Sequence, residues 1–193
     1  MAKPVKRARY VAPSESVRSR LGGLPSHLPS RWPHSAITGT PMAFVAQFYR
    51  DELAPLLPDD ILCIQLYQPL ENYDPNQAPG ELSPLVVTIP RGAALNVSNS
   101  GIANPHIRQL DVEWEDDVES EWIDPERDDE NLGLYLRTKF GGAAPDEAIF
   151  RSGRFVGVIA DRGEGINLGM PSLVLVRRDS SFELVPDYEV DVG

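Results

Sequence analysis

The apolar residues of this chain gather in short runs that are rich in β-branched and aromatic side chains. Runs of this length, bounded by Gly, Pro and Asn, are typical of β-strands. Helical periodicity is confined to two short segments, 11–21 and 50–57, the second of which ends before Pro58. The pattern therefore predicts six strands, at 42–49, 61–67, 85–89, 154–160, 173–176 and 182–185.

A seventh strand is predicted where apolar and acidic residues alternate. Between 109 and 115, the apolar residues Leu110, Val112 and Trp114 alternate with three acidic residues. An alternation of period two is that of a half-buried strand. We therefore expect this strand to bury its apolar side chains and to expose its carboxylates to water.

Length and composition narrow the fold further. The chain has 193 residues, the size of a single domain, and its 15 Gly and 18 Pro residues disfavour long helices. No apolar run approaches the roughly 18 residues that a membrane helix needs. We predict a mainly β (α+β) fold with two curved, mostly antiparallel sheets and few short helices.

Charge is distributed very unevenly along the chain. The formal net charge is −11, which disfavours nucleic acid and anionic membranes as partners and favours basic ones. Residues 111–130 contain twelve acidic residues and one base, so this segment alone has a net charge of −11. Residues 1–20 contain six bases and one acid. We interpret 1–19 as a basic N-terminal arm, solvated and frayed as chain ends commonly are.

The acidic segment 111–130 is the predicted contact surface for a partner. Acidic runs are usually disordered, but this one contains two tryptophans and several aliphatic residues, which favours partial order. A solvated acidic face without a partner is the alternative. The residues predicted to bind the partner are Asp111, Glu113, Trp114, Glu115, Asp116, Asp117, Glu119, Glu121 and Trp122.

The sequence contains few residues that could form a catalytic or metal-binding site. The three imidazoles belong to His27, His34 and His106, and no spacing brings them together as zinc ligands. The single cysteine, Cys63, lies in a predicted core strand and excludes an internal disulfide. The segment 163–169 misses the dinucleotide-binding fingerprint and leads into a strand, so we interpret it as a turn. We predict no enzyme, no cofactor and no metal.

A weak internal repeat divides the chain into two related halves, at about 20–110 and 130–185, with the acidic segment between them. Each half contains a basic residue, an apolar residue, a glycine pair, a nearby proline and two strands. The pairs Gly22-Gly23 and Gly141-Gly142 permit positive φ and close backbone approach. A genuine repeat predicts that the two pairs occupy equivalent turns, and chance similarity is the alternative.

The first half also resembles a known family. Its motifs follow in the order Leu21-Gly-Gly-Leu-Pro25, Arg31-Trp-Pro33, Pro41-Met-Ala-Phe-Val-Ala-Gln-Phe48 and Leu57-Pro58. In this order they resemble the YwqG-like family of bacterial proteins. The second half, with Lys139-Phe-Gly-Gly, resembles that family's C-terminal half and the related eukaryotic programmed-cell-death-2 group. The resemblance implies one domain over 20–193, a mostly β fold of two related halves and no catalytic residues to carry across.

The resemblance also implies a binding role. Members often resemble immunity proteins encoded beside toxins, and the eukaryotic relatives resemble chaperones for a basic ribosomal protein. We therefore expect an immunity protein that occludes a cognate toxin, such as a nuclease, by matching a basic surface with the acidic segment. The alternative is a chaperone or assembly factor for a basic, ribosomal-type client. A third hypothesis is an enzyme or small-molecule binder with a cleft between the halves. The N-terminus lacks the apolar core of a signal peptide, which indicates the cytoplasm.

Overall fold

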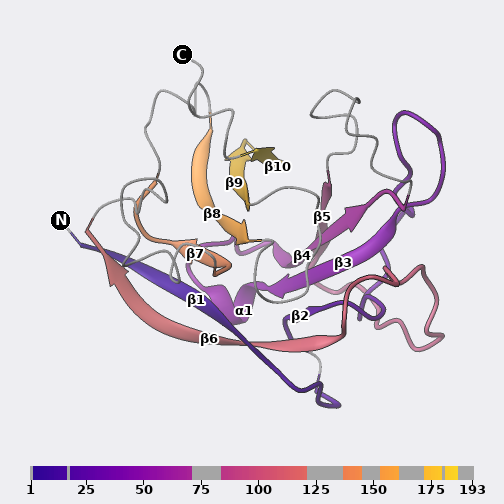
Figure 1. Ribbon diagram of the computed structural model, residues 1–193, viewed down its shortest axis with the longest axis horizontal. Helices are drawn as coiled ribbons and strands as arrows, with labels where there is room; N and C mark the ends of the chain where they lie inside the picture. The colour runs from indigo at the N-terminus through magenta and orange to yellow at the C-terminus, as the bar shows by residue number, and fades with distance from the viewer. Residues whose placement is uncertain are drawn as a thin grey trace. The chain divides into compact units, whose positions relative to one another are not determined.

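The fold is mainly β, as the sequence predicts. We describe it from a computed structural model, over residues 2–16, 18–70, 84–120, 137–144, 153–160, 172–179 and 181–186. The elements, in the order in which the chain reaches them (Figure 1), are β1 (Lys3–Val11), β2 (Arg20–Leu21), β3 (Ala43–Tyr49), α1 (Arg50–Leu53), β4 (Ile61–Gln68), β5 (Leu85–Pro90), β6 (Leu110–Glu119), β7 (Lys139–Gly141), β8 (Arg154–Ala160), β9 (Ser172–Arg178) and β10 (Ser181–Pro186).

All seven predicted strands are present. Strand β8 has the predicted bounds, and the acidic strand β6 runs four residues further than expected. The helix predicted over 50–57 is one turn, Arg50–Leu53. The helix predicted over 11–21 is wrong at the described residues, because Val11 ends β1 and Arg20 begins β2. The backbone N–H and hydroxyl of Ser14 donate to a carboxylate instead of to a helical turn.

Hydrogen bonds connect the strands in the order β10-β9-β8-β7-β1-β6-β2-β3-β4-β5. The prediction of two sheets is therefore wrong, because these strands form one ten-stranded sheet. The sequence interpretation omitted β1, which takes a central place in that order beside β6. Basic side chains at four of its nine positions had marked this segment as a solvated terminus.

The chain divides into two compact units, and we describe each by itself. Unit 1 comprises Met1–Tyr10 and Glu113–Gly193, and unit 2 comprises Val11–Val112. Strand β6 contributes its first three residues to unit 2 and the rest to unit 1.

The core of unit 2 is built on β3 and β4. Every residue of β3 is buried, as are six of the eight residues of β4. The rings of Phe44 and Tyr67 pack edge to face, with centroids 5.8 Å apart, and Phe48 is fully buried. Burial of an aromatic or large aliphatic side chain contributes roughly 1.5–3 kcal/mol, so these two strands account for much of the unit's stability. In unit 1, Val156, Val158 and Ile159 of β8 are buried in the same way.

The two glycine pairs occupy equivalent turns, as the repeat predicts. Leu21 of β2 pairs with Ala46 of β3, and Phe140 of β7 pairs with Gly157 of β8. In each unit the next strand pairing shows a register shift beside that position, between Phe44 and Ala46 and between 155 and 157. The four glycines that follow have φ between 60° and 80°, the left-handed region that glycine adopts without strain.

The residue before each motif makes the same hydrogen bonds in both units. Ser19 Oγ accepts the backbone N–H of Tyr49 at 2.9 Å, and Thr138 Oγ1 accepts that of Ala160 at 3.2 Å. Their carbonyl oxygens accept the N–H groups of Val112 at 2.9 Å and of Ala8 at 2.8 Å. A hydroxyl residue, a basic residue, an apolar residue and two glycines therefore form one structural motif that occurs twice.

Candidate functional site

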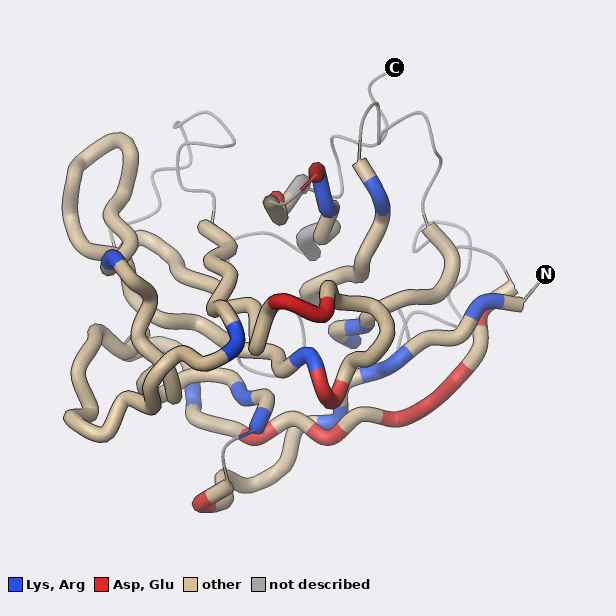
Figure 2. The backbone as a smooth tube through the Cα atoms, turned by 180° about the vertical axis from the view of Figure 1, so that it is seen from behind, with Lys and Arg blue, Asp and Glu red and all other residues tan. Residues whose placement is uncertain are grey.

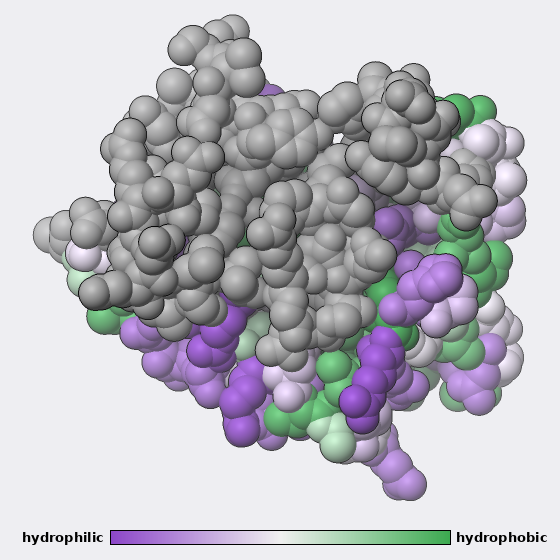
Figure 3. Space-filling view, in the orientation of Figure 1, coloured by the Kyte–Doolittle hydropathy of each residue, from purple (hydrophilic) through white to green (hydrophobic). Residues whose placement is uncertain are grey.

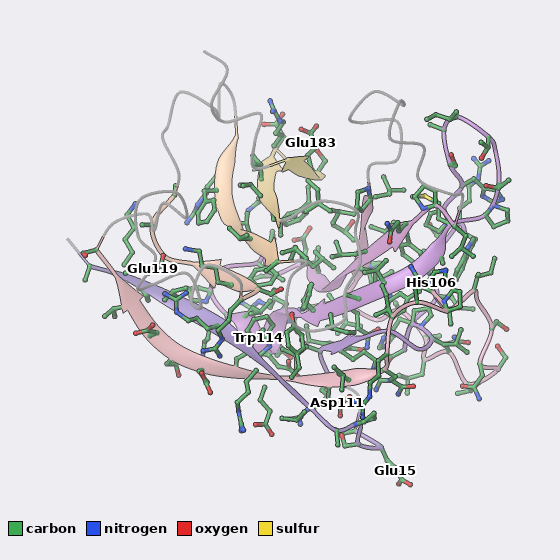
Figure 4. The ribbon with its side chains drawn as sticks, in the orientation of Figure 1. Glu15, His106, Asp111, Trp114, Glu119 and Glu183 are labelled. Atoms are coloured by element: carbon green, nitrogen blue, oxygen red, sulfur yellow. The ribbon has the colours of Figure 1, made fainter. Side chains whose placement is uncertain are left out.

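Strand β6 carries most of the residues that the sequence predicts to bind a partner, and the fold divides them by burial. Figure 4 shows Asp111 and Glu119 at opposite ends of β6, with Trp114 between them. Asp111 and Glu119 are buried. The acidic row, which comprises Glu113, Glu115, Asp116 and Asp117, keeps between 39% and 83% of each side-chain surface exposed. The two remaining predicted residues, Glu121 and Trp122, lie outside the described residues.

Asp111 stabilises a loop and does not face solvent. Its Oδ2 accepts the backbone N–H of Ser14 at 2.7 Å and the Ser14 hydroxyl at 2.6 Å, and the residue is fully buried. The prediction that Asp111 lies on the wet face of the strand is therefore wrong. A period-two pattern places a side chain on a face but does not show that residues far away in the sequence cover that face.

Glu119 sits in a buried cluster of charges in unit 1. Its Oε1 lies 2.5 Å from Arg7 Nη2 and 2.8 Å from Lys139 Nζ. Its Oε2 accepts Lys139 Nζ at 2.7 Å and the N–H of Ala143 at 2.9 Å. A Cβ on Gly142 would clash with this carboxylate, which explains the glycine there. Because removing one member of a buried ion pair costs about 3–5 kcal/mol, Glu119 contributes to the stability of unit 1.

Burial also affects the ionisation of this cluster. Burial lowers the pKa of Lys139, and the hydrogen bonds that its ammonium donates to Glu119 oppose that shift. The cluster combines two cations with one carboxylate, so the Asp117 carboxylate, which accepts Arg7 Nε at 2.8 Å, supplies the second negative charge. Arg7 thus bridges the buried Glu119 and the exposed Asp117.

Every member of the acidic row has a basic partner within unit 1. Figure 2 shows the acidic stretch of β6 (red) beside the basic positions of β1 (blue). The pairs are Glu113 with Arg9, Glu115 with Arg9 (3.5 Å) and Arg137 (2.7 Å), Asp116 with Lys6 (2.6 Å), and Asp117 with Arg7 (2.8 Å). The interpretation of the basic arm as a frayed, solvated terminus is wrong for Lys3–Val11, because this segment is a strand that neutralises part of the acidic segment.

Two of these pairs favour the ionised form of their carboxylates. The hydrogen bond from Arg137 lowers the pKa of Glu115, and the hydrogen bond from Arg7 lowers the pKa of Asp117. These two carboxylates therefore carry negative charge near neutral pH.

Trp114 anchors the strand internally. It is half-buried, and its ring packs edge to face on Phe140 with centroids 5.4 Å apart at 87°. A ring held in this way contributes to packing within unit 1. The apolar side chain that β6 does expose is Val118, at 64%.

The imidazoles and the thiol do not gather into a candidate metal site with the other residues that the structure describes. Among the described residues, no group of three or more His, Cys, Asp or Glu side chains could hold a metal ion. His27 is buried, and its Nδ1 lies 2.9 Å from the Tyr49 hydroxyl. Burial raises the pKa of the Cys63 thiol to about 12, so this thiol stays protonated at neutral pH and is a poor nucleophile.

The basic partners of the row are the functional neighbours that sequence reasoning missed. Their signal was present, because residues 1–20 are strongly basic where 111–130 is strongly acidic. Opposite charge alone, however, does not show that two segments about 100 residues apart are neighbours in one sheet.

Comparison with known proteins does not identify a family for this chain. A scan against models of protein families returns no match, and no curated protein matches the chain. The YwqG-like resemblance thus stays a prediction. No helix within the described residues is long and apolar enough to cross a membrane.

Proposed function

We propose that the chain is a YwqG-like immunity protein that works in the cytoplasm without catalysis and neutralises a toxin by occluding it. The observation that supports this proposal is the acidic row, which places four carboxylates within five consecutive residues of one strand, with Glu113, Glu115 and Asp117 on one face and Asp116 on the other. Five residues of a strand span roughly 15 Å. A ladder of this length complements a basic surface such as the nucleic-acid groove of a nuclease.

The ion pairs of the row do not prevent it from binding. Exposed pairs contribute only about 0.2–1 kcal/mol each, and each carboxylate has unused acceptor sites for a second Arg or Lys. Asp116 is the most accessible member, with 83% of its side chain exposed although Lys6 contacts it. A basic partner can therefore add to these contacts or replace Lys6 and Arg9.

The same ion pairs support selectivity. Arg9 contacts both Glu113 and Glu115, which holds their carboxylates in place before a partner arrives. Ordering in advance lowers the entropic cost of association. A strip that carries both signs also disfavours partners whose charges do not match it.

A chaperone for a basic client would use the same surface, so the experiment must distinguish the two roles. We would express the protein encoded by the neighbouring gene in bacteria, with and without this chain. An immunity protein restores growth and forms a one-to-one complex with a folded toxin. A chaperone instead raises the soluble yield of a client that causes no growth defect.

The contribution of the row is tested with a variant that spares the buried cluster. The double variant Glu113→Gln and Asp116→Asn removes two carboxylates whose partners, Arg9 and Lys6, are not part of that cluster. Asp59→Asn is the matched control, because Asp59 is an exposed carboxylate in unit 2 that is paired with Arg50. The proposal requires weaker protection by the double variant and unchanged protection by the control.

A further inference from the structure

Two loops of unit 2, 24–41 and 91–107, form a shallow apolar groove of about 440 Å³. Its lining is mostly apolar and includes Leu28, Pro29, Trp32, Pro41 and Ile102, with the imidazole of His34 at the same surface. Mostly apolar concave surfaces with a few polar groups are the usual form of binding sites. None of these residues belongs to the acidic row or to its partners.

The floor of the apolar groove is rigid. The Trp32 ring packs edge to face on Tyr67, with centroids 5.2 Å apart, and its Nε1–H donates to the carbonyl of Met42 at 2.9 Å. Gly101, at φ 130°, lies so close that a Cβ there would be 2.7 Å from the indole. Contacts with the sheet on one side and with the second loop on the other therefore hold the indole in place.

Buried glutamines fix the wall of the apolar groove. The side chain of Gln47 accepts the N–H of Ser26 at 2.9 Å and donates to the Ser26 hydroxyl at 2.8 Å. Gln65 donates to the carbonyl of His27 at 2.8 Å, and Asn96 N donates to the carbonyl of Ser26 at 2.8 Å. The chain just before Leu28 is thus tied to β3, to β4 and to the second loop, so a ligand meets a preformed surface.

Apolar side chains continue around the apolar groove. Seven large hydrophobic residues are exposed among the described residues, and four of them lie in these two loops, namely Leu28, Ile37, Leu95 and Val97. Apolar residues (green) also appear at the right of Figure 3, where Figure 1 places loops of unit 2. Val97 is 88% exposed. Exposed apolar side chains that gather beside a groove mark a surface for a macromolecular partner.

The charge of the two loops indicates the charge of the partner. The chain has a net charge of −11, yet no Asp or Glu lies between residues 16 and 50 or between 84 and 110. Figure 2 accordingly shows no acidic position on these loops. Arg31, which directly precedes Trp32, is exposed and forms no ion pair with a described residue. Within these two loops, which the structure describes in full, a partner that approaches the apolar groove meets the cation of Arg31 and no carboxylate.

We propose that the apolar groove binds an extended acidic segment of a protein partner, which places a large apolar side chain against Trp32 and a carboxylate next to Arg31. Recognition of this kind concentrates its free energy in one apolar anchor, and the charged rim adds selectivity. This site goes beyond the proposed function, because it lies in unit 2 and selects the opposite charge from the acidic row.

The test follows the three tryptophan indole N–H signals of the ¹⁵N-labelled protein by NMR, assigned with single substitutions. The probe is a blocked hexapeptide in which leucine and glutamate alternate, and its matched control replaces glutamate with lysine. We expect the glutamate peptide to shift the Trp32 signal in a saturable way and to leave the Trp114 signal unchanged. Arg31→Glu should weaken binding about five-fold, the effect of roughly 1 kcal/mol at a rim.

Leu28→Ser removes an exposed apolar wall and should abolish the Trp32 shift, whereas Val118→Ser, at an exposed position of β6, should leave it unchanged. The proposal is overturned if the lysine peptide binds equally well, or if millimolar glutamate peptide leaves Trp32 unshifted. It is also overturned if oligothymidine or 4-phenylbutanoate saturates the site while the glutamate peptide does not. None of these outcomes depends on the acidic row, so this proposal and the proposed function can fail separately.

Discussion

Arg7 and Glu119 form a buried ion pair, with Nη2 of Arg7 2.5 Å from Oε1 of Glu119 and 2% and 3% of the two side chains exposed. The two residues are 112 positions apart in the chain. In the sequence, the basic N-terminus and the end of the acidic strand look like two separate surfaces. In the structure, this contact joins them within one sheet.

The first prediction concerns this pair. Arg7→Ala leaves the carboxylate of Glu119 buried with Lys139 as its remaining charged partner, so the free energy of unfolding should fall by about 3–5 kcal/mol. Arg9→Ala removes a cation of the same strand whose side chain is 58% exposed, and should cost less than about 1 kcal/mol. Urea denaturation of both variants measures the difference, and equal losses would contradict the distinction between the buried and the exposed arginine of β1.

Trp114 provides a second prediction. Trp114→Ala removes the ring that packs on Phe140, so it should lower the free energy of unfolding by about 2 kcal/mol, roughly half the cost for a fully buried aromatic residue. Val118→Ala, at an exposed position of the same strand, should be nearly neutral. If thermal melts show no loss for Trp114→Ala, the ring does not anchor the strand.

The local sequence predicts the strands well because their signal is local. Runs such as 61–68 and 154–160 are apolar and β-branched whatever their neighbours are. Strand β1 was missed because its buried arginine is stable only beside Glu119, and no pattern within 3–11 records that contact. Asp111 was misplaced for the same reason, since Ser14 covers it from another segment.

The glycine pairs were predicted correctly because positive φ limits residue choice at the turn itself. The composition of the segment revealed the acidic row. It did not reveal that basic residues of other segments pair with that row. The apolar groove escaped sequence reasoning altogether, because its lining comes from two loops that are distant in the sequence. Gln47 and Gln65 tie the first loop to β3 and β4, and Asn96 joins it to the second loop.

The repeat leads to a third prediction. Ser19→Ala and Thr138→Val each remove the hydroxyl that accepts a buried backbone N–H, of Tyr49 and of Ala160. Both variants should lose about 1–3 kcal/mol, the cost of a buried donor without a partner. Ser16→Ala is the control, because Ser16 is exposed and its Oγ lies 2.6 Å from the hydroxyl of Ser14 in the same loop. A loss in one unit and none in the other would argue against the equivalence of the two motifs.

The fourth prediction concerns pH. Burial lowers the pKa of His27 below its usual value of 6.5, so in the interval below 6.5 the unfolded chain binds more protons than the folded one. Stability contributed by neutral His27 is therefore complete above pH 6.5 and falls as the pH decreases toward the folded-state pKa. His27→Gln should flatten the pH dependence of the free energy of unfolding between pH 7.5 and 5.5. A wild-type free energy of unfolding that is constant over this interval would contradict the prediction.

The central claim is that the acidic row attracts a basic partner through charge. The most direct measurement is stopped-flow association with the protein encoded by the neighbouring gene, at about 50 mM and 300 mM salt. Electrostatic steering raises on-rates by roughly 10 to 1,000-fold at low salt. We predict that Glu113→Gln with Asp116→Asn lowers the on-rate at low salt several-fold and flattens its salt dependence, while Asp59→Asn changes neither. An unchanged on-rate and salt slope in the double variant would show that the row is a solvated face without a role in binding.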